Sequence, residues 1–189
     1  MRRATIFVMV VLKIAVADDR WRKKKRLELL YFIKRTSVLL KGLYHIGKIS
    51  FIPVDRSSKR KLIHNPKYRF SYANAFRMRN VSQNSKVLLI IRAPESTLQS
   101  LREEKIGYGY GFAISSSRLD SKHGYDGAYI FFSKYTYESL RALIVHEVGH
   151  LFGLMHCSKK QCIMTAYPPI FPSPIIFCMT HQEQLSHFK

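Results

Sequence analysis

The sequence predicts a single domain that contains both strands and helices, because strand-length apolar runs occur together with two long helical segments. Its 189 residues suit one domain, and 47% of them are hydrophobic and 23% charged. This composition excludes a disordered tail, a collagen-like rod and a multi-span membrane protein. The predicted strands are residues 4–12, 47–54, 86–92, 108–115 and 128–133, and the predicted helices are residues 19–43 and 136–151.

The N-terminal segment fits two interpretations. A basic start, an apolar run from Ala4 to Leu12 and the triplet Ala15-Val16-Ala17 are typical of a signal peptide over residues 1–17. The β-branched residues of the same run favour a buried first strand, and Lys13 interrupts the apolar stretch. We expect the strand and a cytoplasmic protein; the alternative is a cleaved leader and a secreted protein.

Positive charge is concentrated in the first half of the chain. The formal net charge is +20, and residues 1–94 hold 23 basic and 4 acidic residues. Residues 19–43 combine a basic start with apolar residues at helical spacing, which predicts a basic amphipathic helix. We expect this helix to pack on the sheet with its charges in solvent. The alternative is a patch that binds nucleic acid or an anionic membrane.

The middle of the chain supplies the predicted sheet. Residues 55–86 are polar and basic without clear periodicity, so we expect mostly loop or short helix there. Residues 86–92 (KVLLIIR) form a continuous apolar run, which predicts a central strand covered on both faces. The segment 108–115 is rich in glycine and aromatic residues and predicts an edge strand.

The second helical segment carries residues suited to metal chemistry. Thr136 is a candidate N-cap, and Gly153 is a candidate stop. His146 and His150 are four residues apart, so they lie one turn apart on the same helix face and can bind one ion. Glu147 is offset around the helix axis, which suits a carboxylate that contacts water at the metal.

The pattern continues past the helix as His146-Glu147-x-x-His150-x-x-Gly153-x-x-His156. Gly153 lets the chain reverse in a left-handed conformation, so His156 can return as a third nitrogen ligand. Three histidines leave one tetrahedral position for water, whose pKa a zinc ion lowers towards ~7. The sequence therefore predicts a catalytic zinc, with Glu147 as the general base.

This string resembles the zinc signature of the metzincin peptidases, which have a methionine turn beneath the metal. Met164 matches that turn. His156 is followed by Cys157 and later by Cys162-Ile163-Met164, a combination that resembles the archaemetzincin (archaelysin) family over residues 146–164.

The resemblance implies a metzincin-like α+β fold. A twisted mixed β-sheet would pack on two main helices, the second bearing the zinc motif, with a C-terminal zinc-stapled subdomain. Residues 1–189 would then form one metalloprotease domain. The resemblance also implies that an edge strand above the cleft, here residues 109–115, binds substrate by strand addition.

The three cysteines fall in the last third of the chain and are too few for a disulfide framework, which favours a metal site. The family closes its pattern with a C-x-x-C pair. Here the pair reads Cys178-Met179-Thr180-His181, after a shorter gap, and zinc accepts such a Cys₃His set. The implied structural zinc, the second of two zinc ions per chain, occupies segment 157–181 with the ligands Cys157, Cys162, Cys178 and His181. Free thiols, a disulfide between the first two cysteines, and His187 as the fourth ligand are the alternatives.

The predicted function is that of a zinc-dependent peptidase, a monomer that acts on peptides or proteins. If it is an aminopeptidase, it needs an acidic anchor, for which Glu138, Asp120 and Asp126 are available. The alternative is a basic module that binds nucleic acid or acidic lipid on a zinc scaffold, with little or no hydrolysis. A secreted toxin-like protease is a third hypothesis, tied to the signal peptide. Tyr167 is expected in the core or at the rim.

Overall fold

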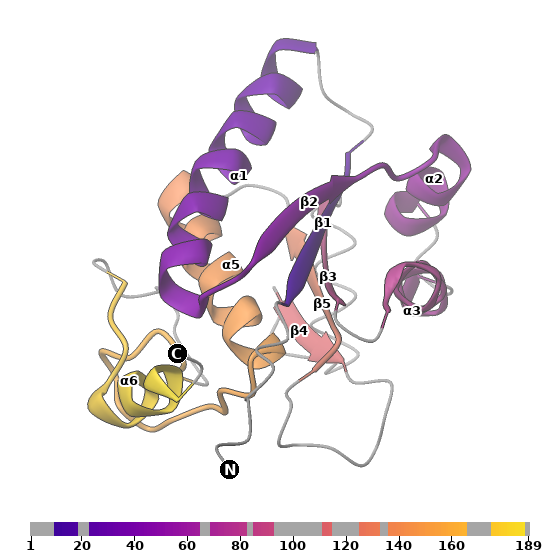
Figure 1. The fold of residues 1–189 in the computed structure, drawn as a ribbon. Coiled ribbons are helices and arrows are strands. Elements are labelled where there is room, and N and C mark those ends of the chain that lie inside the picture. The colour runs from indigo at the N-terminus through magenta and orange to yellow at the C-terminus, as the bar shows by residue number, and fades with distance from the viewer. Residues whose placement is uncertain are drawn as a thin grey trace.

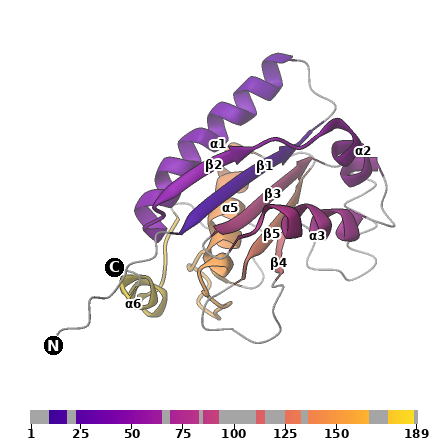
Figure 2. The same cartoon turned by 45° about the vertical axis from the view of Figure 1, so that its right-hand side comes forward.

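The chain folds into a mixed β-sheet with helices on both faces (Figures 1 and 2). The computed structural model describes residues 10–18, 23–64, 69–82, 85–92, 111–114, 125–132, 136–165 and 175–187. The strands are β1 (Val11–Ala17), β2 (Lys48–Ile52), β3 (Ser85–Arg92), β4 (Gly111–Ile114) and β5 (Gly127–Phe132). The helices are α1 (Lys23–Tyr44), α2 (Arg56–His64), α3 (Arg69–Asn80), α5 (Tyr137–Leu151) and α6 (Met179–Ser186).

The strands follow the order β2-β1-β3-β5-β4 across the sheet. β1 pairs in parallel with β2 and β3, and β3 pairs in parallel with β5. The helix α1 connects the parallel neighbours β1 and β2. The helices α2 and α3 connect β2 to β3, which lies on the other side of β1. β4 is antiparallel to β5 and forms an edge of the described sheet, which confirms the edge-strand prediction over residues 111–114. Residues 108–110 and 115 lie outside the described residues.

The central strand β3 is covered on both faces. Leu88 and Ile90 belong to the cluster that includes α1 and α5, whereas Val87, Leu89 and Ile91 belong to the cluster that includes α2 and α3. All five side chains are fully buried. Because neither face meets water, the strand has no polar alternation, and the prediction made from its continuous apolar run is confirmed.

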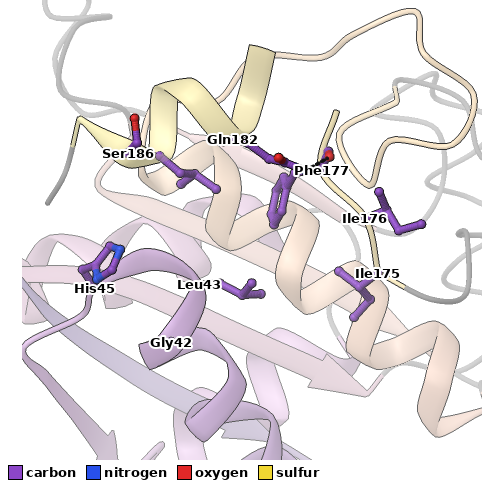
Figure 3. Close-up of a pocket in the computed structure, with 9 residues that line it drawn as sticks. Gly42, Leu43, His45, Ile175, Ile176, Phe177, Gln182 and Ser186 are labelled. Carbon is purple, nitrogen blue, oxygen red and sulfur yellow. Dashed lines mark hydrogen bonds between the residues drawn. The ribbon is translucent and has the colours of Figure 1, made fainter. Parts of the chain in front are cut away.

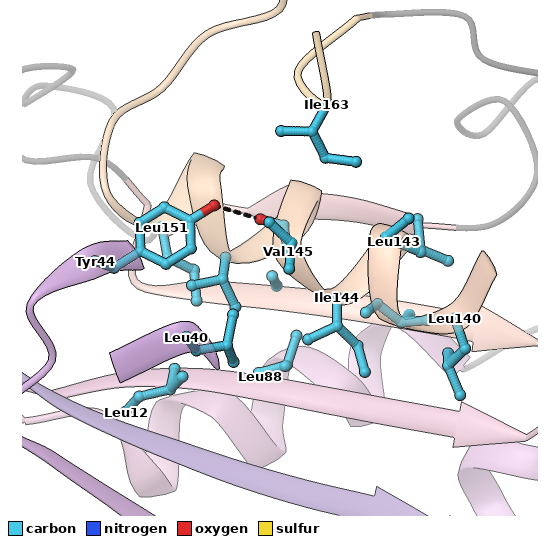
Figure 4. Packing of buried hydrophobic residues seen from close by; sticks show 14 of the residues in the cluster. Leu12, Leu40, Tyr44, Leu88, Leu140, Leu143, Ile144, Val145, Leu151 and Ile163 are labelled. Carbon is cyan, nitrogen blue, oxygen red and sulfur yellow. Dashed lines mark hydrogen bonds between the residues drawn. The ribbon is translucent and has the colours of Figure 1, made fainter. Parts of the chain in front are cut away.

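The helices α1 and α5 form one layer against the sheet, as Figure 4 shows. Leu40 of α1, Leu12 of β1, Leu88 of β3 and Ile144 of α5 are all completely buried in this cluster. Burying each such side chain contributes roughly 1.5–3 kcal/mol. The hydroxyl of Tyr44 donates to the carbonyl of Val145 at 2.6 Å and joins the two helices (Figure 4).

The opposite face of the sheet carries α2 and α3, where the sequence predicted mostly loop or short helix. α3 is twelve residues long, so this prediction was wrong for residues 69–80. Each helix buries a narrow stripe, namely Leu62 and Ile63 from α2, and Ala73 and Phe76 from α3. So few apolar residues give only a weak helical periodicity in the sequence. Packing on the sheet, rather than this local pattern, stabilises the two helices.

The first strand lies later than predicted. β1 spans Val11–Ala17, whereas the apolar run begins at Ala4, and residues 1–9 lie outside the described residues. Lys13 does not interrupt the strand, because its Nζ donates to the carbonyl of Asn80 at 2.6 Å. β1 lies between β2 and β3, so cleavage after Ala17 would remove an interior strand. None of the described helices is both long and apolar enough to cross a membrane.

Candidate metal centre

The last two turns of α5 hold the predicted motif in the interior. The helix begins after Thr136, whose Oγ1 accepts a hydrogen bond from the Ser139 amide at 3.2 Å, which confirms the predicted N-cap. His146, Glu147 and His150 are only 5%, 2% and 7% exposed. The helix therefore places two imidazoles and a carboxylate where bulk water is largely excluded.

A tight reversal after α5 brings His156 back to the helix. Gly153 has a φ of 81°, a left-handed conformation that glycine adopts without strain. Its amide donates to the carbonyl of His150, and the Leu154 amide donates to that of Gly149, both at 3.0 Å. The predicted stop at Gly153 is confirmed.

Three imidazole nitrogens converge on one point. The Nε2 atoms of His146 and His150 are 3.2 Å apart, those of His146 and His156 are 3.3 Å apart, and those of His150 and His156 are 3.0 Å apart. Zinc–nitrogen bonds of about 2.0–2.1 Å in a tetrahedron separate the ligand atoms by roughly 3.3 Å. The triangle therefore has the size that a zinc ion needs.

Backbone carbonyls orient two of these rings. Nδ1 of His146 donates to the carbonyl of Ile163, and Nδ1 of His150 donates to that of Leu154, each at 2.7 Å. Because Nδ1 holds the proton in both rings, Nε2 presents a lone pair. Burial is the main cause that lowers the pKa of His146 to about 4 and that of His150 to about 3. Both rings are thus neutral near pH 7, as metal ligation requires.

Glu147 lies beside the three histidines. It follows His146 by one residue, so its side chain leaves the helix about 100° further around the axis. Within the part of the chain that the structure describes, its buried Oε2 atom has no hydrogen-bond partner. Burial raises the pKa of this carboxyl to about 8. A buried carboxylate oxygen is costly without a partner, so the site fits a metal with a water molecule beside it.

Met164 packs directly beneath α5 and is fully buried. A Cβ atom on Gly149 would lie 2.6 Å from Sδ of Met164 and 3.2 Å from the hydroxyl oxygen of Tyr44. Gly149 therefore allows a close approach that no other residue would permit. The Met164 carbonyl accepts from the Cys157 amide at 3.0 Å, which ties the predicted methionine turn to the segment after His156.

Sequence reasoning missed the role of Tyr125 at this site. Its amide donates to the carbonyl of His150 at 3.2 Å, and its ring lies edge-on to the His150 ring, with centroids 6.1 Å apart. It comes from the segment just before β5, and no local sequence pattern connects that segment with α5. The contact between Tyr125 and His150 therefore becomes visible only in the tertiary structure.

The second predicted ligand set also comes together. The ligand atoms of Cys157, Cys162, Cys178 and His181 all lie within 4.8 Å of one another. Nδ1 of His181 is 3.2 Å from Sγ of Cys162 and 3.4 Å from Sγ of Cys178. The cysteines are free thiols, so the disulfide alternative is absent from the structure. This donor set is one that zinc accepts.

The helix α6, which the sequence analysis did not predict, positions two of these residues. Cys178 is its N-cap and His181 lies in its first turn. His181 and Leu185 are the buried residues of this short helix. Its sequence offers little apolar periodicity, and its placement depends on the cluster that it joins.

The other histidines that the structure describes do not join either cluster. His187 ends α6, and the side chain of His64 is not described. His45 lines a separate hollow of about 490 Å³ between the end of α1 and α6, shown in Figure 3. Tyr167, His123 and Asp120 lie outside the described residues, as does most of the proline-rich loop after Met164.

The fold and the histidine cluster above a buried methionine define a metzincin-type zinc metallopeptidase. The chain belongs to the Matrixin family of M10 peptidases, whose profile matches residues 17–173. That range includes β2, β3, β4 and β5, the helices α1 and α5 and all three histidines of the cluster, but only the last residue of β1.

Curated relatives support the narrower family as well. An archaemetzincin of Haloarcula marismortui is 38% identical over 64 residues, which cover 33% of this chain and 36% of the relative. An archaemetzincin of Aeropyrum pernix is 33% identical over 67 residues, 31% of this chain and 33% of the relative. The alignments thus span about a third of the curated relatives.

Solved structures share the fold over almost the whole chain. The archaemetzincin of Methanopyrus kandleri has a TM-score of 0.56 at 17% identity and covers 96% of both chains. A zinc-dependent peptidase of Methanocorpusculum labreanum has a TM-score of 0.53 at 16% identity, covering 93% of this chain and 99% of that one. These comparisons confirm the predicted archaemetzincin resemblance and the metzincin-like fold.

Proposed function

We propose that the chain hydrolyses peptide bonds, with a zinc ion held by His146, His150 and His156 and with Glu147 as general base. The observation that supports this most directly is the triangle of Nε2 atoms at 3.0–3.3 Å, next to a buried carboxylate oxygen that has no partner among the described residues. When bound, zinc would acidify water and polarise the scissile carbonyl.

The residues of the chain divide the remaining work. The three imidazoles hold the ion, and the carbonyls of Ile163 and Leu154 keep two of the rings in the required tautomer. Glu147 takes a proton from water at Oε2 and returns it to the departing amine, so no group outside the site is needed for proton transfer. The side of β4 that no other described strand occupies would accept an extended peptide, which would add to the sheet.

The substitution Glu147→Gln tests the general base. We expect zinc content to stay at the wild-type level, while hydrolysis of a peptide library falls by at least about a hundredfold, because the amide cannot accept the proton. The matched control is Glu28→Gln at an exposed position of α1, which should retain activity. Hydrolysis by Glu147→Gln at the wild-type rate would show that the proton acceptor is another group.

We also propose that Cys157, Cys162, Cys178 and His181 hold a second, structural zinc. Four protein donors close this site to water. It adjoins the three-histidine site through the peptide bond between His156 and Cys157. The second ion would fix the chain on both sides of the methionine turn and hold α6 in place.

Metal counting tests the second site. Purified protein should contain two zinc ions, one released readily by a chelator and one resistant, because four ligands shield the latter. Cys162→Ser should lose the resistant ion alone, whereas His181→Cys should keep it by restoring a four-cysteine set. One zinc per chain, together with three titratable thiols in the native protein, would contradict this assignment.

A further inference from the structure

The outward face of α1 carries an apolar stripe that the sheet does not use. Leu27, Tyr31 and Val38 are 58%, 63% and 72% exposed. They are spaced by four and seven residues, so they lie along one side of the helix. The opposite side packs into the core through residues such as Leu29 and Ile33. α1 is therefore apolar on two faces, and nothing in the described part of the chain covers the outer one.

Basic side chains flank this stripe on both sides. Lys34 and Lys41 lie along one flank, and Arg35 lies on the other, with its guanidinium 5.9 Å from the centroid of the Tyr31 ring. The helix begins with the sequence Lys23-Lys24-Lys25-Arg26, and Glu28 is the one acidic residue among its 22. A partner for this face must therefore be both anionic and able to accept apolar side chains.

These two requirements favour a lipid surface over a nucleic acid. Nucleic acid would satisfy the lysines and arginines, but it would leave Leu27 and Val38 against a phosphate backbone. An anionic bilayer accepts both, since apolar side chains enter between the headgroups while the lysine and arginine stems extend to the lipid phosphates. We propose that α1 docks the protein, lying in the plane of the interface, on an anionic membrane surface.

The hollow in Figure 3 adjoins the end of the same face. Gly42 follows Val38 by one helical turn, has no atom within 4 Å of its Cβ position, and lines this hollow. Leu43, Phe177 and Leu185 contribute apolar walls. His45, Gln182 and Ser186 also line the hollow, so beyond the C-terminal end of the stripe the surface is partly apolar and partly polar.

Docking on this face leaves the metal centre free, because α1 meets α5 with its inner side, where Tyr44 bonds to Val145. The outer side points away from the sheet, as Figure 2 shows. Membrane binding therefore does not depend on hydrolysis, and Glu147→Gln should bind vesicles as the wild type does.

Co-sedimentation with vesicles tests the proposal on the full-length, zinc-loaded protein. We expect binding to vesicles of phosphatidylcholine with phosphatidylglycerol, no binding to phosphatidylcholine alone, and loss of binding at high salt. Lys34→Glu should weaken partitioning by at least about tenfold, since each charge near such a surface changes it about fivefold. Val38→Ser, which leaves the charge unchanged, should weaken it about threefold or more by removing inserted apolar surface.

The matched control is Arg60→Glu on α2, which makes the same charge change at an exposed position in the layer on the other face of the sheet. It should weaken binding by less than about threefold. Equal losses in Arg60→Glu and Lys34→Glu would overturn the proposal in favour of diffuse charge attraction. Unaltered binding by Val38→Ser would also overturn the proposal, because no apolar insertion would then take place. Binding of a duplex or single-stranded oligonucleotide without binding of anionic vesicles would overturn it in favour of a nucleic-acid partner. All three positions are exposed, so each variant should remain folded, which circular dichroism would check.

Discussion

At the residue scale, Gly149 shows how one missing side chain shapes the metal centre. Glycine in a helix interior costs up to ~1 kcal/mol relative to alanine. The chain accepts this cost because Met164 and the Tyr44 hydroxyl approach the Gly149 backbone closely. The methionine turn and the helix with the histidines are thereby in direct contact. A displacement of the turn should therefore also displace the helix.

We expect Gly149→Ala to destabilise the protein by about 1–2 kcal/mol, because overpacking against the buried Met164 outweighs the gain in helix propensity. Affinity for the more readily chelated zinc should also fall, since the turn beneath the ligands must move. Urea unfolding and chelator competition measure the two effects. The control is Gly42→Ala, at a helical glycine with open space around it, which should be neutral or slightly stabilising. A stabilised Gly149→Ala with unchanged zinc affinity would contradict the packing argument.

At the element scale, the start of β3 is tied to the segment before β5 and to the end of α5. Nζ of Lys86 donates to the carbonyl of Tyr125 at 2.8 Å and lies 5.8 Å from the centroid of the Phe152 ring. Tyr125 in turn contacts His150 through its amide and its ring. The strand β3 thereby helps to position the segment that packs on His150, one of the proposed zinc ligands. Burial of the Lys86 ammonium group is nevertheless costly.

This contact predicts a pH dependence of stability. Burial lowers the pKa of Lys86 from 10.5 to about 8, and the nearby Asp126 opposes this shift. Between these two pH values the unfolded chain binds a proton that the folded chain does not, so the contribution of Lys86 to stability rises with pH.

Relative to Lys86→Met, the wild type should therefore gain about 2–3 kcal/mol between pH 7 and pH 10. Urea unfolding at each pH measures the difference. The exposed Lys41→Met serves as the control and should show a nearly constant difference. A gap between wild type and Lys86→Met that does not vary with pH would mean that the lysine is solvated in the folded state.

At the scale of the whole molecule, positive charge is distributed unevenly between the two halves of the chain. The metal centre and its supports come mainly from the second half, which is nearly neutral, whereas the first half carries almost the entire excess of positive charge. Within the described residues, the ion pair between Arg77 and Asp126 at 2.6 Å links α3 to the segment before β5. Most of the other basic side chains whose burial the structure describes face solvent, where like charges repel one another.

Added salt should therefore stabilise the protein. Raising NaCl from low to moderate concentration screens the repulsion and should increase Tm by roughly 2–4 °C, the shift expected for about 1 kcal/mol in a protein of this size. KCl at the same ionic strength should act equally, which separates screening from specific ion binding. A melting temperature that falls with either salt would show that attractive charge pairs dominate.

Much of the candidate site could be predicted from the sequence because its logic is local. The histidines one turn apart, the offset Glu147, the cap at Thr136 and the reversal at Gly153 follow from helix geometry and short spacings. The continuous run in β3 likewise shows that both of its faces are buried. Each of these features needs only neighbouring residues to be recognised.

Other features depended on the packing of distant segments. Tyr125 meets His150, the Ile163 carbonyl fixes the ring of His146, and Met164 fills the space beside Gly149 only after the chain has folded. The helix α6 and the α2–α3 layer carry too little periodicity of their own to be recognised. The periodic residues of α1, such as Leu29, Ile33 and Leu40, did indicate the side that the sheet covers. They did not indicate that a second apolar side would be left exposed. Spacing along the chain decides which side chains share a face, and only tertiary contacts decide what that face meets.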